Sequence, residues 1–85
     1  MNNESGYNNE LGYRVYRKLE YFFINKIPIH FSLNFGGWKN GLILDLNSVK
    51  LTMVLKEFEE GDLPFLLESI DINSIKAFRK KEIGE

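Results

Sequence analysis

The sequence predicts a mainly β domain in which an N-terminal amphipathic helix leads into a compact antiparallel β-barrel of about five strands. Apolar residues first recur at helical spacing, and from Ile27 onward they alternate with polar residues at the period of a half-buried strand. Turn signals separate the short strands at intervals of about 8–12 residues, which favours an antiparallel barrel or sandwich over βαβ units. Closing a barrel removes the edges that so short a chain would otherwise expose.

The helix is expected to begin near Asn8 or Asn9, because either side chain can cap the free N–H groups of the first turn. Its apolar stripe has spacings of three and four residues, as one face of an α-helix requires. The helix must end by Lys26, because Pro28 restricts the residue before it to extended geometry. The stripe consists of Leu11, Val15, Leu19, Phe22 and Phe23.

Five strands are expected at residues 27–33, 38–46, 51–56, 63–69 and 74–79. The pair Gly36-Gly37 marks the first turn, because paired glycines admit positive φ. In the second strand, Leu42, Leu44 and Leu46 are expected to share one face, since side chains alternate along a strand.

The composition describes one globular domain without cysteine chemistry. The 85 residues allow one domain, 44% of them are hydrophobic, and the absence of cysteine excludes disulfides and thiolate metal sites. Residues 10–79 form the expected domain, between a disordered tail at residues 1–9 and a charged C-terminal tail at residues 80–85. The polar N-terminus and the lack of a long apolar run predict a cytoplasmic protein with no membrane segment.

No pattern in the sequence indicates an enzyme, a metal site or a cofactor. His30 is the only histidine, and without cysteine or a second histidine a structural role is favoured over metal binding. Glu59, Glu60 and Asp62 fall in an expected hairpin turn, where solvent exposure is favoured over acid–base chemistry. The paired glycines before the second strand do not open a helix, so they do not form a phosphate-binding loop.

Two features of the sequence are compatible with nucleic acid. Arg14, Arg17 and Lys18 form a basic cluster at i, i+3 and i+4 on the helix, for which a solvated face is favoured and a phosphate contact is the alternative. Trp38 and the tyrosines at positions 7, 13, 16 and 21 can stack on bases, although packing on the barrel or between subunits is favoured. The net charge of −1 argues against a protein that coats nucleic acid by bulk electrostatics.

Two segments resemble the motifs of the Sm-like family, which includes the Lsm proteins and bacterial Hfq. Residues 38–47, WKNGLILDLN, are similar to the first motif, in which a glycine in a strongly bent second strand precedes an alternating apolar run. Residues 70–75, IDINSI, are similar to the second motif, a short turn between strands four and five. With the helix and the Asn25-Lys26 entry to the first strand, the resemblance covers residues 10–79 and implies a five-stranded, strongly bent antiparallel Sm-like barrel. In such a barrel Gly41 removes a Cβ that would clash at the bend.

The resemblance implies a non-catalytic protein that binds RNA and forms a homo-oligomeric ring, in which strand four of one subunit pairs with strand five of the next. By motif position, Asn47 stands where the family has an RNA-binding Asp, and Glu68 with Ser69 stands near its Arg-Gly pair, so the usual RNA pocket is altered. The expected RNA contacts are Asn47, Ser48 and Lys50 in the loop after strand two, together with the three helix cations. The alternative is a structural or protein-interaction scaffold with the same barrel and no RNA binding, which the inverted charge at Glu68 favours.

Overall fold

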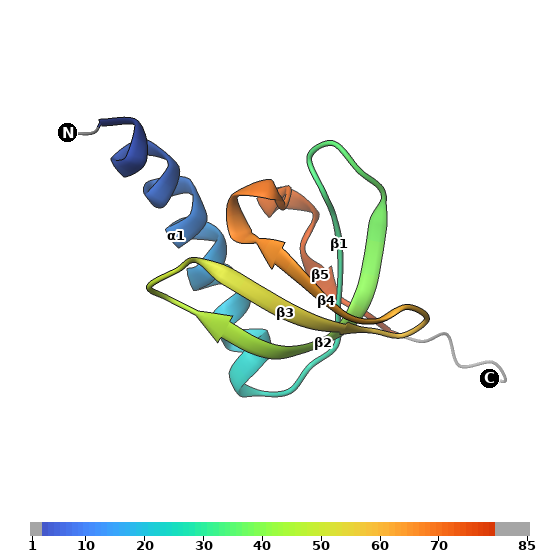
Figure 1. The fold of residues 1–85 in the computed structure, drawn as a ribbon. Helices are drawn as coiled ribbons and strands as arrows, with labels where there is room; N and C mark the ends of the chain where they lie inside the picture. The colour runs from blue at the N-terminus through green and yellow to red at the C-terminus, as the bar shows by residue number, and fades with distance from the viewer. Residues whose placement is uncertain (1–2, 80–85) are drawn as a thin grey trace, which may run out of the picture.

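A long N-terminal helix and a five-stranded antiparallel sheet make up the fold (Figure 1). The computed structural model describes the backbone of residues 3–79 and the side chains of residues 10–79. Its elements are α1 (Asn3–Ile24), β1 (Ile29–Ser32), β2 (Trp38–Asn47), β3 (Thr52–Glu57), β4 (Gly61–Leu66), the 3₁₀ helices η1 (Leu67–Ser69) and η2 (Ile72–Ser74), and β5 (Lys76–Ala77). The expected mainly β fold with a leading helix is confirmed.

α1 begins earlier than the sequence predicts. It starts at Asn3, so the expected start near Asn8 or Asn9 is too late, and the segment expected to be a disordered tail contributes helical backbone from residue 3 onward. Residues 3–9 contain no proline, and extending a helix that packing already holds costs much less than nucleating one. The expected C-terminal tail, residues 80–85, lies outside the described residues.

α1 ends within the predicted limit, in a Schellman motif. Lys26 adopts the left-handed conformation with φ 54°, and its N–H donates to the Phe23 carbonyl at 3.2 Å. The Ile27 N–H donates to the Phe22 carbonyl at 2.9 Å. These two bonds satisfy carbonyls of the last turn and direct the chain into β1. Across residues 3–79, α1 included, no helix has both the length and the apolar character needed to cross a membrane.

The strands are arranged in the order β4-β3-β2-β1-β5, and each neighbouring pair is antiparallel. The sheet is not closed into the expected barrel, because no ladder joins β4 to β5 within residues 3–79. The reason lies in the connection between them, where η1 and η2 take up most of residues 67–74 and leave β5 only two residues long. An isolated bridge between Leu33 and Ile70 ties the end of β1 to this connection.

β2 carries the close approach that the sequence predicts at Gly41. This residue pairs with Glu57 on β3. A Cβ at position 41 would overlap the Lys56 carbonyl oxygen and would lie 2.9 Å from Leu55 Cγ. Only glycine therefore allows β2 and β3 to approach each other so closely at this point.

A bulge between Ile43 and Asp45 changes the alternation of side chains along β2. Ile43 is buried on the core side, Leu44 is exposed, and Leu46 beyond the bulge packs against the core. The expectation that Leu44 and Leu46 share a face is therefore wrong, because the extra residue of the bulge reverses the phase.

Two further strands and one turn differ from the sequence-based expectation. β4 spans Gly61–Leu66 instead of residues 63–69, because the chain turns into η1 at Leu67. β5 spans Lys76–Ala77 instead of residues 74–79. The glycine pair before β2 does not use positive φ; among the described glycines only Gly61 does, with φ 93° at the start of β4.

The hydrophobic core lies between α1 and the curled sheet. Val15 and Leu19 of α1 are fully buried, whereas Leu11, at the start of the predicted stripe, is 38% exposed. Burying one aliphatic or aromatic side chain of this size contributes about 1.5–3 kcal/mol. The buried apolar set comprises Val15, Leu19, Ile29, Phe31, Ile43, Met53, Leu55, Leu67, Ile70 and Ile75.

Candidate functional site

The turn between β2 and β3 carries three of the predicted RNA contacts. Asn47 ends β2, and its Oδ1 accepts the backbone N–H groups of Val49 at 2.9 Å and Lys50 at 2.8 Å. This Asx turn occupies the amide oxygen with the closure of the loop. The side chains of Ser48 and Lys50 are exposed and remain accessible to a ligand.

The three predicted helix cations have different surroundings. Arg14 and Arg17 are exposed, and the Arg17 guanidinium carbon lies 5.7 Å from the centre of the Tyr13 ring. Lys18 Nζ donates to the Ile72 carbonyl of η2 at 3.2 Å, so it helps to hold α1 against the connection to β5. Two of the three cations are therefore free to meet a phosphate, and the third has a structural bond.

The structure does not gather the turn residues and the helix cations into one patch. Gly12 faces the β2–β3 turn, since a Cβ there would lie 3.2 Å from Leu51 Cδ1. Lys18 instead faces η2, and Arg14 lies one helical turn before it on the same flank of α1. The two predicted groups thus occupy opposite flanks of the helix.

The two loops singled out by the motif resemblance lie side by side. The Leu67 N–H of η1 donates to the Leu51 carbonyl at 3.0 Å, which joins the connection after β4 to the turn after β2. Glu68 uses its carbonyl oxygen to accept from Asn34 Nδ2 at 3.0 Å, and Ser69 Oγ donates to the Leu66 carbonyl at 2.6 Å. The bond to Asn34 uses the backbone of Glu68 and not its side chain. The Glu68 carboxylate thus adds a negative charge to η1, which disfavours an anionic ligand.

The tyrosines predicted as possible stacking groups pack mostly on their own helix. The Tyr13 and Tyr16 rings are stacked with centres 5.9 Å apart, and Tyr21 meets Phe22 edge to face at 5.5 Å. The side chain of Tyr7 lies outside the described side chains.

His30 takes a structural position on β1. Its ring stacks on the Trp38 indole with centres 4.4 Å apart and planes within 7°, and its Nδ1 is hydrogen-bonded to Asn40 Oδ1. The strand register places these groups together, because His30 pairs with Asn40 and the neighbouring Ser32 pairs with Trp38. His30 thereby fixes one face of the Trp38 ring.

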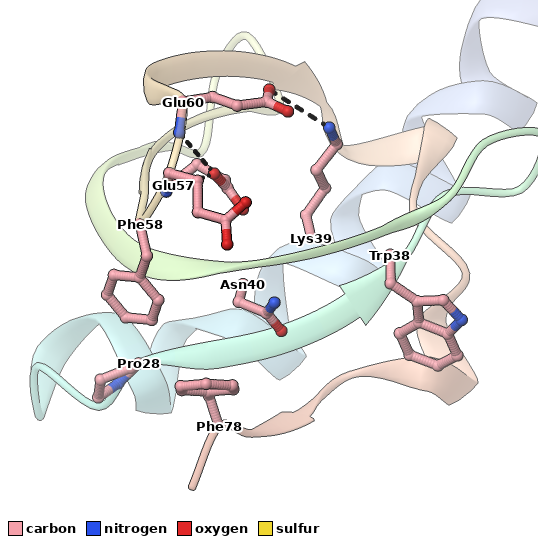
Figure 2. A pocket seen from close by; sticks show the side chains of 9 residues that line it. Pro28, Trp38, Lys39, Asn40, Glu57, Phe58, Glu60 and Phe78 are labelled. Carbon is pink, nitrogen blue, oxygen red and sulfur yellow. Dashed lines mark hydrogen bonds and ion pairs between the residues drawn. The ribbon is translucent and has the colours of Figure 1, made fainter. Parts of the chain in front are cut away.

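A groove that the sequence-based site prediction missed opens beside this cluster (Figure 2). It has a volume of about 600 Å³ and lies between the start of β2, the turn that joins β3 to β4, and the segment after β5. Figure 2 shows Phe58, Pro28 and Phe78 along one side of the groove and Trp38 at the other end, with Glu57 pointing inward. Trp38 and Phe58 are 55% and 53% exposed, so much of their apolar surface remains open to a ligand.

Glu57 is the buried carboxylate of this groove. It follows Met53 and Leu55 at every second residue of β3, so it occupies a core-facing position at the end of the strand. Its Oε1 accepts the backbone N–H groups of Glu59 and Glu60, each at 2.8 Å. These bonds lower the pKa of Glu57 below its usual range and keep it ionised.

The groove is lined by more negative than positive side chains. Lys39 Nζ lies 3.5 Å from Glu60 Oε1, while Glu59 is exposed at the rim. A smaller hollow of about 250 Å³ shares Phe78 with the groove and is lined by His30 and residues 76–79. Among the side chains of residues 10–79, no group of three or more His, Cys, Asp or Glu is placed to hold a metal ion.

The groove left two signals in the sequence. Trp38 stands at the start of the expected second strand, and Glu57 continues the alternation of Met53 and Leu55 one residue beyond the expected third strand. Their meeting depends on the register of three strands, which the sequence alone does not specify. Comparison with models of known protein families, with curated proteins and with solved structures found no match.

Proposed function

We propose that this chain is a divergent, non-catalytic Sm-like protein that assembles into a homo-oligomeric ring and binds RNA. The observation that carries the proposal is the strand order β4-β3-β2-β1-β5, which leaves β4 and β5 as the two edges of the sheet. The close approach at Gly41, inside the segment that resembles the first Sm motif, supports the same assignment.

The edges are suited to pairing between subunits. One side of β4 pairs with β3 over six residues, and within the described chain its other side has no neighbouring strand. Unpaired backbone groups at a sheet edge are a template for another strand. If β4 pairs with β5 of the next subunit, the interface also covers Leu66, which is 56% exposed. Pro64 is typical of an edge strand, and because it has no N–H, a strand that pairs with β4 receives one backbone donor fewer from it.

RNA would meet two separate sets of groups on each subunit. Ser48 and Lys50 lie in the turn beside η1, and Arg14 and Arg17 lie on the exposed side of α1. A ring repeats each set once per subunit, so weak phosphate contacts add up along one strand of RNA. Because phosphate contacts release counterions, we expect the binding to fall steeply with salt.

Assembly is tested by light scattering of the purified chain with measurement of its absorbance ratio at 260 and 280 nm. We expect a mass several times the 10.0 kDa of one chain. Leu66→Glu on β4 should lower that mass. Leu44→Glu, at a position that is 43% exposed against 56% for Leu66 but lies on the central strand β2, should leave it unchanged. A monomer at all concentrations would contradict the ring.

RNA binding is tested by fluorescence anisotropy with oligo-U and oligo-A at low salt. The double variant Arg14→Gln/Arg17→Gln should reduce the slope of log K against log salt by about 1.4 for each subunit that contacts the RNA, at about 0.7 per phosphate contact on a single strand. Lys56→Gln, an exposed cation on β3, is the matched control. Absence of salt-dependent binding at micromolar ring would contradict the RNA proposal and leave the assembly proposal standing.

A protein-interaction scaffold is the second candidate function. The observation that favours it is the groove at Trp38, which is aromatic and carries more carboxylates than cations. Such a surface repels phosphate. A ring that copurifies without RNA but retains a protein partner would support this function over the first.

A further inference from the structure

RNA binding does not explain the groove between the start of β2 and the β3–β4 turn. Two of its aromatic rings, Trp38 and Phe58, are each more than half exposed instead of packing into the apolar core. The Phe58 and Phe78 rings lie 5.4 Å apart, and together they form a continuous apolar wall. Exposed aromatic surface lining a concavity is typical of a ligand site.

The His30 ring stacks on one face of the Trp38 ring, and the other face is available to a ligand. The hydrogen bond between His30 and Asn40 holds the histidine ring in this orientation. A rigid ring loses little conformational entropy when a ligand stacks on it. Trp38 is also the only tryptophan of the chain, so its fluorescence reports directly on this groove.

The charge of the groove selects the kind of ligand. Glu57, Glu59 and Glu60 contribute three carboxylates, and Lys39 contributes one ammonium, which leaves a formal balance of −2. Lys39 is already paired with Glu60 at 3.5 Å, so it offers little to an incoming anion. Backbone N–H groups hold Glu57 in its ionised form. Negative charge beside exposed aromatic faces favours an organic cation.

We propose that this groove binds an arginine side chain of a partner protein or peptide, with the guanidinium stacked on the aromatic wall and paired with the carboxylates at the rim. Arginine fits better than lysine, because its guanidinium is planar, weakly hydrated and able to stack on an aromatic ring while it pairs with a carboxylate. A nucleotide fits worse, because its phosphate would meet the negative balance of the groove. The site lies apart from the turn and helix residues proposed to contact RNA, so the two proposals fail independently.

The test is a titration of the full chain with the peptide acetyl-Gly-Arg-Gly-Arg-Gly-amide, followed by Trp38 fluorescence and by calorimetry. The peptides with lysine and with citrulline in place of arginine are the chemical controls. We expect saturable binding of the arginine peptide in the micromolar to low millimolar range, at least threefold weaker binding of the lysine peptide, and no binding of the neutral citrulline peptide up to about 5 mM.

Two variants locate the binding. Phe58→Ala should weaken the arginine peptide by about fivefold to thirtyfold, and Glu59→Gln by about twofold to fivefold. The hydrogen bond that Glu59 makes in this turn is donated by its backbone N–H to Glu57 Oε1, so replacing its side chain leaves the turn intact. The matched controls are Phe35→Ala, whose ring is fully exposed in the β1–β2 turn, and Asp45→Asn, an exposed carboxylate of β2 outside the groove.

Four outcomes would overturn the proposal. The first is no response to the arginine peptide at about 5 mM, and the second is equal binding of the citrulline peptide. The third is an affinity within twofold of the parent for both Phe58→Ala and Glu59→Gln. The fourth is a Trp38 response to oligo-U that Phe58→Ala abolishes. The last outcome would assign the groove to nucleic acid. Circular dichroism of each variant verifies that it is folded before its affinity is compared.

Discussion

Replacing Gly41 by alanine tests the close approach of β2 and β3 directly. The new Cβ would overlap the carbonyl oxygen of Lys56 and would stand 2.9 Å from Leu55 Cγ. The leucine can shift its side chain, but the carbonyl belongs to the backbone of β3 and is fixed by the ladder between β2 and β3. The clash can be relieved only by moving the two strands apart.

The cost follows from that geometry. Overpacking a rigid core costs about 1–3 kcal/mol and occasionally more, and a clash with backbone belongs at the upper end, near 3 kcal/mol. A domain of 85 residues has a total stability of about 4–13 kcal/mol. We therefore expect Gly41→Ala to lower the melting temperature by about 12–24 °C, or to prevent folding altogether.

Two other glycines provide the comparison. A Cβ at Gly37 meets no atom within 4 Å and its φ is not positive, so Gly37→Ala should be neutral or stabilise by up to about 1 kcal/mol. Gly61 also has open space, but its φ is 93°, so Gly61→Ala should cost about 1–3 kcal/mol through backbone strain alone. Urea denaturation followed by circular dichroism measures all three. A free energy of unfolding for Gly41→Ala within about 0.5 kcal/mol of the parent would refute the reasoning, since surface substitutions already vary by that amount.

Three further predictions concern the helix, the turn and the groove. Leu19→Ala, which empties a fully buried position, should lower the free energy of unfolding by about 2–5 kcal/mol. Leu11→Ala, at a partly exposed position, should lower it by less than about 1.5 kcal/mol. Equal losses of stability in thermal denaturation would contradict the position of α1. Asn47→Ala removes the acceptor for two backbone N–H groups and should cost about 1–2 kcal/mol in urea denaturation, and a loss no larger than that of its exposed neighbour Ser48→Ala would argue against the Asx turn. The folded-state pKa of Glu57 is lowered, so its ionised form stabilises the protein above about pH 4.3 and this contribution disappears as the pH falls through the folded-state pKa. Glu57→Gln should therefore be less stable than the parent at neutral pH and should approach it in acid, and a difference independent of pH between 7 and 3 would show that the carboxylate charge contributes nothing.

Much of the fold follows from local patterns. The spacing of Val15, Leu19 and the phenylalanines predicted a helix, and the switch to alternation at Ile27 predicted the strands, because side-chain period is set by backbone geometry. Pro28 predicted the limit at which α1 ends. The early start of the helix was missed, because the Asn-rich segment has no periodicity and its helical state depends on continuation from a packed helix.

The candidate site was less predictable. The sequence identified Asn47, Ser48 and Lys50 as one loop and the helix cations as another group, and each group exists, but their separation on opposite flanks of α1 depends on how the helix packs. The groove escaped prediction because Trp38 and Phe58 belong to different strands and turns.

Residue identity and local period are enough to predict that a helix precedes alternating strands, that cysteine chemistry is absent, and that a close approach needs glycine at position 41. Other features come only from the packing of distant segments: across residues 3–79 the sheet is open between β4 and β5, and a bulge places Leu44 and Leu46 on different faces. The meeting of Trp38, Phe58 and Glu57 in one groove has the same origin. Those outcomes depend on strand register and on the path of the 3₁₀ connection, which arise from contacts between segments far apart in the chain.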